Sequence, residues 1–262
     1  MKTIETDFIA GNCAKYFVQQ EVTKTLQDRG GRGLSTTIVD MGCGNASKWG
    51  WLAKLGGNGQ LKFFGFDPDA GAIRQAQARF PDWTFVAAPA YAMTSVVETA
   101  DVIVSFSTLE HVYQRRAFIQ AARAIMKEGS EFYLNYDNGH FLTGTEWMRN
   151  LFGPILARCG VERYFQAFVW QEEIEAILRE FEFRVIREFN FHQASSKEFQ
   201  HVLAGTPAMK PYMDAWLDFD LKVNALLQSE PESRRKADSN KYHLSKLFIL
   251  GVDGAPPSRP PA

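Results

Sequence analysis

The chain has little cysteine, no apolar run long enough to cross a bilayer and almost no excess charge. Its three cysteines, Cys13, Cys43 and Cys159, lie far apart and form no C-x-x-C pair, which argues against a disulfide framework and a zinc site. No segment reaches the roughly 18 apolar residues of a membrane span, and the N-terminus lacks the cationic and apolar parts of a secretory signal. We therefore expect a cytoplasmic protein without a membrane anchor.

The charge balance also limits the choice of partners. Lysine and arginine number 29 against 30 acidic residues, which gives a formal net charge of -1. A protein with this balance has no basic field to hold a nucleic-acid backbone, so nucleic acid is not expected as a partner. The length of 262 residues and the hydrophobic content of 45% suit one α/β domain with a full core.

The most informative pattern lies in residues 37–47. An apolar run reaches Asp40 and is followed by Gly42 and Gly44, with Cys43 between them. A β-branched run that ends at an acid and closely spaced glycines predicts a buried parallel strand with a sharp turn, whose backbone is open to a ligand. Parallel α/β sheets bind nucleotides at such turns.

A second acid follows the next predicted strand. Residues 61–67 form an apolar run whose last residue, Asp67, lies 23 residues after Gly44. A carboxylate at this point can accept both hydroxyl protons of a ribose. The alternative is that Asp67 caps a helix that starts at Pro68, because proline suits the first helical turn.

The first turn distinguishes two kinds of cofactor. A dinucleotide site needs G-x-G-x-x-G and a helix N-terminus that can receive a pyrophosphate, but here Ser47 stands at the third glycine position. The charge of Asp40, just before the turn, would repel a phosphate and attract a cation. A sulfonium or an ammonium fits better, and S-adenosylmethionine carries both.

With these residues in place, the chain resembles the class I S-adenosylmethionine-dependent methyltransferases of the small-molecule type. Three segments carry the resemblance, and they are residues 39–45, 65–69 and 101–112. Together they span roughly residues 36–137. Three such motifs in register are far more specific than one glycine motif.

The alternation of strand and helix patterns predicts a doubly wound, mostly parallel α/β sheet. The expected strands are 36–41, 61–67, 83–87, 101–106, 131–137, 183–191 and 244–252, and the expected helices are 8–28, 47–55, 69–79, 115–127, 171–180 and a longer helix marked by Tyr212, Trp216, Phe219, Val223, Leu226 and Leu227. The resemblance implies seven strands with an antiparallel last strand.

The expected domain organisation has five parts. They are an N-terminal helix and linker (1–34), a cofactor-binding core (35–140), an aromatic insertion (141–170), the completion of the sheet (171–253) with a helical insertion at 195–241, and a disordered tail (254–262). The polar stretch 229–241 is expected to be a mobile loop. Both insertions adjoin strands at the active edge, so we expect them to form a helical lid that excludes water. The alternatives are that their aromatic residues belong to the core or to a dimer interface.

The resemblance implies which residues hold S-adenosylmethionine. The turn at Gly42 and Gly44 would bind the methionine part, Asp40 would lie near its ammonium, and Asp67 would bind the ribose. The full set of expected cofactor-binding residues is Asp40, Gly42, Cys43, Gly44, Asp67, Pro68, Ala90, Tyr91, Ser105 and Phe106, of which Ala90 and Tyr91 would line the adenine edge and Ser105 and Phe106 would lie beneath the methyl donor.

Three residues are alternatives for a catalytic base. His111 follows the fourth strand, and an unperturbed imidazole, with a pKa of about 6.5, can accept a proton at neutral pH. Asp137 and His140 follow the fifth strand. His111 has a structural alternative, a hydrogen bond to backbone at the start of a helix. Asp137-Asn138 also resembles the metal pair of magnesium-dependent catechol-type enzymes, but Ser105-Phe106-Ser107 lacks their other aspartate, so no metal is expected unless Glu110 replaces that ligand.

The chemical class of the methyl acceptor can be inferred only by elimination. The chain lacks the Asn/Asp-Pro-Pro-aromatic turn of enzymes that methylate nucleic-acid bases or protein amides. We therefore expect a small-molecule acceptor such as a sugar or a natural-product intermediate, with O-methylation favoured. The alternatives are a nicotinamide-dependent oxidoreductase, or a catalytically silent nucleoside-binding partner protein. The sequence leaves the oligomeric state open.

Overall fold

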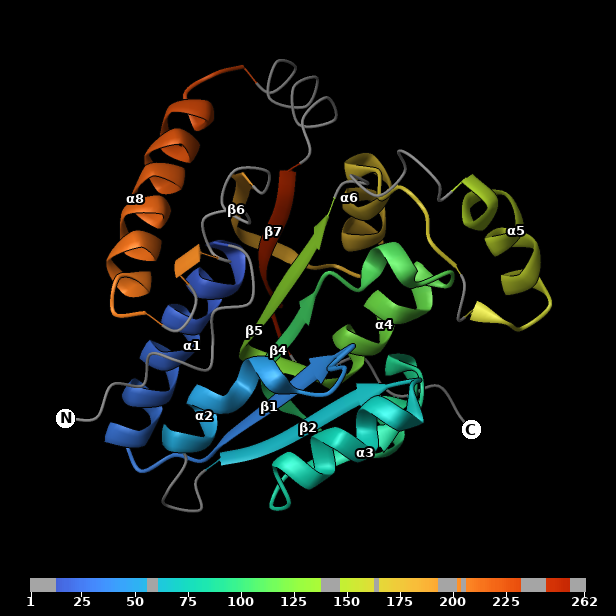
Figure 1. Ribbon diagram of the computed structural model, residues 1–262, viewed down its shortest axis with the longest axis horizontal. Coiled ribbons are helices and arrows are strands. Elements are labelled where there is room, and N and C mark those ends of the chain that lie inside the picture. Colours follow the sequence, from blue (N-terminus) through green and yellow to red (C-terminus); the bar gives the residue numbers. More distant parts are fainter. Residues whose placement is uncertain are drawn as a thin grey trace.

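The computed structural model describes residues 13–55, 61–137, 147–162, 165–192, 202–203, 206–231 and 244–254. They form one seven-stranded sheet of order β3-β2-β1-β4-β5-β7-β6 (Figure 1). The strands are β1 (Thr36–Met41), β2 (Leu61–Asp67), β3 (Thr84–Ala87), β4 (Ala100–Phe106), β5 (Met126–Asp137), β6 (Arg184–His192) and β7 (Leu244–Gly251). β1 to β5 pair in parallel, and β7 runs antiparallel to both β5 and β6. The expected doubly wound sheet with an antiparallel last strand is confirmed.

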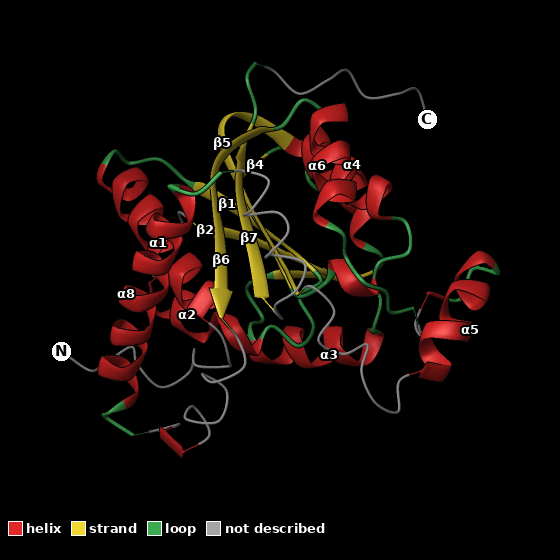
Figure 2. Cartoon of the chain, turned by 90° about the horizontal axis from the view of Figure 1, so that it is seen from above, coloured by secondary structure: helices red, strands yellow, loops and turns green. Residues whose placement is uncertain are grey.

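Helices cover both faces of the sheet (Figure 2). One face packs against α1 (Cys13–Gly31), α2 (Gly50–Leu55), α3 (Ala70–Arg79) and α8 (Met209–Gln228). The other packs against η2 (Ala90–Ser95), α4 (Arg115–Ile125) and α6 (Gln171–Glu180). Two short 3-10 helices, η1 (Ser47–Trp49) and η3 (Leu109–His111), follow β1 and β4, and α5 (Trp147–Arg158) stands apart from both layers (Figures 1 and 2).

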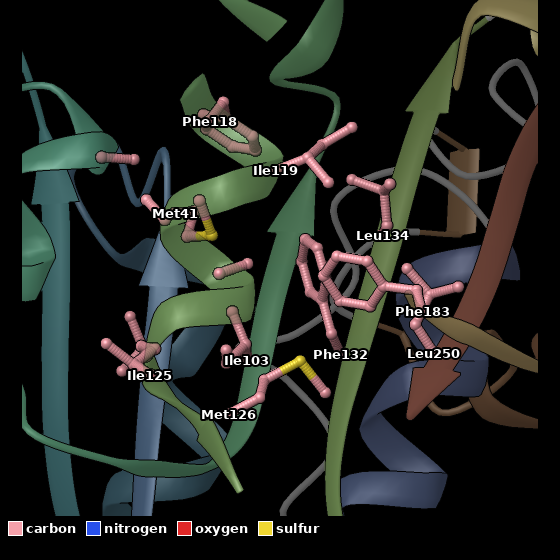
Figure 3. Packing of buried hydrophobic residues seen from close by; sticks show 14 of the residues in the cluster. Met41, Ile103, Phe118, Ile119, Ile125, Met126, Phe132, Leu134, Phe183 and Leu250 are labelled. Carbon is pink, nitrogen blue, oxygen red and sulfur yellow. The ribbon is translucent and has the colours of Figure 1, made fainter. Parts of the chain in front are cut away.

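The alternation of side chains along each strand builds the two cores. On the α4 face, Ile103 of β4 and Leu134 of β5 meet Phe118 and Ile119 of α4 (Figure 3). All four are essentially buried. On the α1 face, Val102 and Val104 of β4 pack with residues of α1 and α8. Strands covered on both sides need apolar residues at nearly every position, and β4 is buried throughout.

The structure corrects several expected boundaries. α1 continues through Gly31, three residues beyond the expected helix end at residue 28. β5 begins at Met126, five residues before the expected start at 131, because Met126 pairs with Ala100 ahead of an irregularity in the β4 ladder. The aromatic insertion contains the helix α5. Residues 1–12, most of 229–241 and the tail beyond 254 lie outside the described residues.

The expected helix near residue 212 is present as α8, but its buried face differs from the apolar stripe that predicted it. The buried positions are Met209, Met213, Leu217, Asp220 and Asn224. Phe219 and Leu226 are instead exposed, at 53% and 70% of their surface. The physical reason is that Asn224 must face the edge strand β6 to pair with its free backbone groups. The Asn224 side chain donates to the carbonyl of Asn190 and accepts from the amide of Asn190, both at 2.7 Å.

Candidate active site

The carboxyl ends of four parallel strands meet at one edge of the sheet and bring the predicted polar residues together. Asp40 of β1 lies between Gly65 of β2 and Val104 of β4 in the strand register. Asp67 closes β2 and Asp137 closes β5. Ligands bind at this edge in open α/β sheets, so these side chains define the candidate active site.

The glycine turn after β1 is fixed to the end of β2. The amides of Gly42 and Cys43 both donate to the carbonyl of Phe66, at 2.8 and 3.0 Å. Gly42 has φ +86, and a Cβ there would lie 2.3 Å from Oγ1 of Thr108. Gly44 has φ +56, and a Cβ there would meet nothing within 4 Å. Gly42 is therefore required by packing, whereas the space that a side chain on Gly44 would enter is open.

Cys43 packs inward from the same turn. Its side chain is 3% exposed, and its sulfur would lie 2.9 Å from a Cβ on Gly65. Burial, with the charges of Asp40 and Asp67, raises the pKa of the Cys43 thiol. The side chain fills the space above β2, so only the backbone of Cys43 is available to a ligand.

Asp67 links the second strand to the glycine turn. Its Oδ2 accepts the amide of Gly44 at 2.8 Å, and its Oδ1 accepts the amide of Asp69 at 2.9 Å. The expected alternative, that Asp67 caps the next helix, is wrong, because Asp69 is the N-cap of α3 and accepts from Gly71 and Ala72. Asp67 is half-buried and Pro68 beside it is exposed.

Asp40 is fully buried and already holds a cation. Its Oδ2 accepts the indole N–H of Trp49 at 2.6 Å and lies 3.0 Å from Nζ of Lys48. Its Oδ1 has no hydrogen-bond partner within the described chain. Part of the Asp40 charge is thus neutralised by Lys48, and one oxygen remains for a further donor.

The other expected cofactor residues line two sides of the edge. Ala90 is buried and Tyr91 half-buried at the start of η2. Ser105 and Phe106 are both buried but point to opposite faces of the sheet. The Oγ of Ser105 has no partner among the described residues, whereas Phe106 packs on Trp49 and lies beneath Lys48, whose Nζ is 5.1 Å from the ring centroid.

The candidate bases have different surroundings. Asp137 is 6% exposed, and its amide donates to Oε1 of Glu110 at 3.3 Å. Glu110 is 2% exposed, and burial together with the neighbouring Asp137 raises its pKa to about 8. His111 is exposed at the end of η3, and His140 lies outside the described residues. The structure brings Asp137 and Glu110 together and leaves His111 on the surface.

Two lysines complete the site, and no sequence pattern singles them out. Lys48 follows the glycine turn, and Lys15 comes from α1, where it interacts electrostatically with Lys48, Asp137, Glu110 and Asp40. The signal for Lys15 is weak, a single lysine within the apolar stretch of Cys13 to Val18. Only the packing of α1 on the sheet places it among these charges.

Within the described part of the chain, no group of three or more histidine, cysteine, aspartate or glutamate side chains is arranged to hold a metal ion. None of the described helices combines the length and apolar character needed to cross a membrane. The three cysteines are free thiols, with Cys13 and Cys43 buried and Cys159 exposed.

Comparison with known proteins agrees with this geometry. Residues 38–129 match the family model of a methyltransferase domain. A protein of Invertebrate iridescent virus 6 that is named as a methyltransferase, 235L, is 26% identical over 98 residues, which cover 37% of this chain. The chain spans 36% of the length of that relative.

Solved structures share the fold. Magnesium protoporphyrin IX methyltransferase (ChlM) of Synechocystis PCC 6803 with bound SAH aligns with a TM-score of 0.51 and 14% identity, over 92% of this chain and 84% of that chain. Its structure with bound SAM aligns with the same TM-score and 12% identity, over 92% and 80% of the two chains.

The chain thus has an α/β fold that it shares with solved methyltransferase structures, with a polar site at the carboxyl ends of its parallel strands. More particularly, residues 38–129 are similar to a methyltransferase domain.

Proposed function

We propose that the protein transfers a methyl group from S-adenosylmethionine to a small-molecule acceptor, with oxygen favoured as the nucleophile. The observation that carries this proposal is the contact between Asp67 and Gly44, which sets a half-buried carboxylate beside a glycine whose Cβ side is open. A carboxylate there can bind ribose hydroxyls while the turn at Gly42 and Gly44 holds the methionine part. S-adenosylmethionine supplies a methyl group on a sulfonium that an aligned nucleophile can displace.

The remaining cofactor contacts are assigned on the same basis. Ala90 and Tyr91 are proposed to contact the adenine, and Phe106 and Ser105 to lie beneath the methyl donor. The Oδ1 atom of Asp40 is proposed to accept from the methionine ammonium, because it is the oxygen that neither Lys48 nor Trp49 contacts. The site residues therefore fit the group.

The chain's own contribution to the chemistry is mainly positioning. An in-line displacement needs a nucleophile held about 3 Å from the methyl carbon. A base is needed if the nucleophile arrives protonated. Asp137 is better placed for that role than His111, because Asp137 is buried at the end of β5 whereas His111 is exposed. His140 stays a predicted alternative.

The proposal of a small acceptor rests on the charge of the chain and on missing recognition turns. The net charge of -1 provides no basic surface for nucleic acid. The three free thiols support a location in a reducing compartment such as the cytoplasm.

Calorimetry with S-adenosylhomocysteine and with a nicotinamide dinucleotide tests the cofactor. We expect binding of the first and none of the second, and the reverse result would favour an oxidoreductase. Incubation with methyl-labelled S-adenosylmethionine and a fractionated metabolite extract then tests transfer. A protein that binds the nucleoside but labels no fraction would be the catalytically silent alternative.

A further inference from the structure

Arg115 is a buried arginine whose guanidinium joins three parts of the chain. It lies at the start of α4 and is 7% exposed. Its Nε donates to the carbonyl of Leu109 at 3.1 Å, its Nη2 donates to the carbonyl of Ala167 at 3.1 Å, and its Nη1 pairs with Oε2 of Glu173 at 2.7 Å. The three partners lie in η3, in the segment 165–170 between α5 and α6, and in α6. We call residues 165–170 the exit segment, because they lead out of the aromatic insertion.

The exit segment is also bound to η3 by its own backbone. The amide of Ala167 donates to the carbonyl of Glu110 at 2.9 Å. The rings of Phe165 and Tyr113 meet edge to face, with their centroids 5.3 Å apart, and Phe165 is buried. The exit segment therefore packs on the turn after β4, and Arg115 bonds to both sides of this contact.

The side chain of Glu110 connects η3 to the end of β5. Glu110 is 2% exposed, and its Oε1 accepts the amide of Asp137, the last residue of β5, at 3.3 Å. Its Oε2 has no hydrogen-bond partner among the described residues. The backbone of Glu110 is thus held by the exit segment while its side chain is held by β5. A shift of η3 would change the position of Glu110 relative to Asp137, which is the better placed of the candidate bases.

The proposed cofactor contacts are made by other bonds. Asp67 is joined to Gly44 at the ends of β2 and β1, and Asp40 is paired with Lys48. None of the three bonds of Arg115 reaches these residues. A change at Arg115 should therefore affect the β4 and β5 side of the site and leave the nucleoside side intact.

We propose that Arg115 is a positioning residue for methyl transfer, which fixes η3 to the exit segment and thereby holds Glu110 and Asp137 in place beside the acceptor. This inference rests on the proposed function. Arg115 acts through Glu110 and touches neither the cofactor nor the acceptor. Arginine suits this task because its planar guanidinium presents several donors in a fixed fork, so that one side chain can bind two carbonyls and a carboxylate at once.

Arg123 provides a matched control within the same helix. It is also buried, with 6% of its surface exposed, and its Nε donates to the carbonyl of Phe181 at 3.1 Å. It lies near the end of α4, where the chain enters β5 at the opposite edge of the sheet. Arg115→Met and Arg123→Met should both lower the stability of the fold, but only Arg115→Met should loosen η3.

Hydrogen exchange followed by NMR tests this role without cofactor or acceptor. The amide of Ala167 is protected by its bond to Glu110. We expect this amide to exchange about 10-fold or more faster in Arg115→Met than in the wild type, after correction for the change in global stability measured by urea unfolding. It should exchange at the wild-type rate in Arg123→Met. Equal protection of Ala167 in Arg115→Met and the wild type would overturn the inference.

A second measurement separates the acceptor side from the cofactor. Arg115→Met and Arg115→Lys should bind S-adenosylhomocysteine with an affinity close to that of the wild type. Both should transfer label from methyl-labelled S-adenosylmethionine to the metabolite extract about 10-fold or more slowly, because lysine keeps the charge but lacks the fork that binds three partners. Arg123→Met should keep both properties. Should Arg115→Met not fold, Arg115→Lys carries both measurements.

Three outcomes would count against the role of Arg115. A wild-type rate of transfer in Arg115→Lys would mean that charge alone is needed there. A loss of affinity for S-adenosylhomocysteine as large as the loss of transfer would mean that Arg115 supports the fold as a whole. If the wild-type protein binds no S-adenosylhomocysteine, the proposed function fails and the role of Arg115 in transfer fails with it. If the wild type binds it and transfers label, and Arg115→Met transfers equally well, only the present inference fails.

Discussion

The carboxylate of Asp67 accepts the amide of Gly44 at 2.8 Å, so the side chain that closes the second strand is bonded directly to the turn after the first. The second oxygen of Asp67 accepts the amide of Asp69 at 2.9 Å. One side chain thus connects the glycine turn after β1 with the residues before α3, on the two sides of the proposed nucleoside-binding site. Its geometry depends on the carboxylate having two acceptor oxygens.

Asp67→Asn should therefore weaken cofactor binding more than it weakens the fold. The amide side chain has one acceptor in place of two, so one of the two backbone contacts and one ribose contact are lost. We expect the affinity for S-adenosylhomocysteine to fall by about 10-fold or more, since hydrogen bonds of a charged group contribute about 1.5–3 kcal/mol. Calorimetry measures this fall.

Asp69→Ala is the matched control for that experiment. Asp69 caps α3 and is exposed, so its loss should cost about 1 kcal/mol of unfolding free energy and leave the affinity unchanged. Equal affinities for Asp67→Asn and the wild type would remove Asp67 from the site. A loss of affinity in Asp69→Ala would mean that α3, and not Asp67, determines the geometry of the nucleoside-binding site.

Alanine substitutions at Gly42 and Gly44 should separate packing from ligand binding. Gly42→Ala puts a Cβ 2.3 Å from Thr108 at φ +86, and we expect a loss of about 3 kcal/mol in urea unfolding. Gly44→Ala meets no clash at φ +56 and should cost about 1 kcal/mol.

For binding of S-adenosylhomocysteine, Gly44→Ala should have a clear effect although its effect on stability is the smaller of the two. Its Cβ would project into the open space beside the turn, so Gly44→Ala should lose affinity for S-adenosylhomocysteine although it remains folded. Ala46 shows that this turn tolerates alanine in the left-handed region, since it has φ 55. Similar unfolding free energies for the two variants, or wild-type affinity in Gly44→Ala, would contradict the assignment.

The sheet could be predicted from sequence because its strands carry local signals. β1 and β2 have the expected bounds, since each is an apolar run that ends at a turn or an acid. The start of β5 could not be predicted, because Lys127, Glu128 and Gly129 interrupt its pattern. Its early pairing with β4 depends on a tertiary contact.

The polar parts of the site were less predictable. Asp40, Gly42, Gly44 and Asp67 lie in a motif and gather where expected, while Lys15 reaches the site only through the packing of α1 on α8. Asp220 and Asn224 are buried on α8 for a similar reason. A hydrophobic pattern records apolar faces and gives no sign of a polar side chain that satisfies a distant backbone.

Glu110→Gln should change how stability depends on pH. The folded protein holds the pKa of Glu110 at about 8, above the ordinary 4.5, so between these values the folded state binds more protons than the unfolded state. The wild type should therefore lose stability as pH rises from 4.5 to 8, by up to about 1.4 kcal/mol per pH unit, and Glu110→Gln should lack this contribution.

Urea unfolding of both proteins across this pH range measures the difference between them. The free energy of unfolding of the wild type, relative to that of Glu110→Gln, should be highest at the acid end of the range. This difference should level off above pH 8, where Glu110 is ionised in both the folded and the unfolded state. Parallel curves for the two proteins would show that Glu110 titrates normally. Because lysines also titrate at higher pH, the comparison uses the difference between the proteins and not either curve alone.

The buried pair of Asp40 and Lys48 should show strong coupling in a double-mutant cycle. Lys48→Met removes the ammonium that is paired with the fully buried Asp40 and leaves the indole of Trp49 as the donor to its Oδ2, so we expect a loss of about 3 kcal/mol. Adding Asp40→Asn removes the uncompensated charge and should restore part of that loss, as measured by urea unfolding. The exposed pair of Lys222 and Asp218 provides the control, because Lys222→Met should change stability by less than about 0.5 kcal/mol. Additive effects at Asp40 and Lys48 would mean that the two charges do not interact in solution. Lys48 would then not neutralise part of the Asp40 charge.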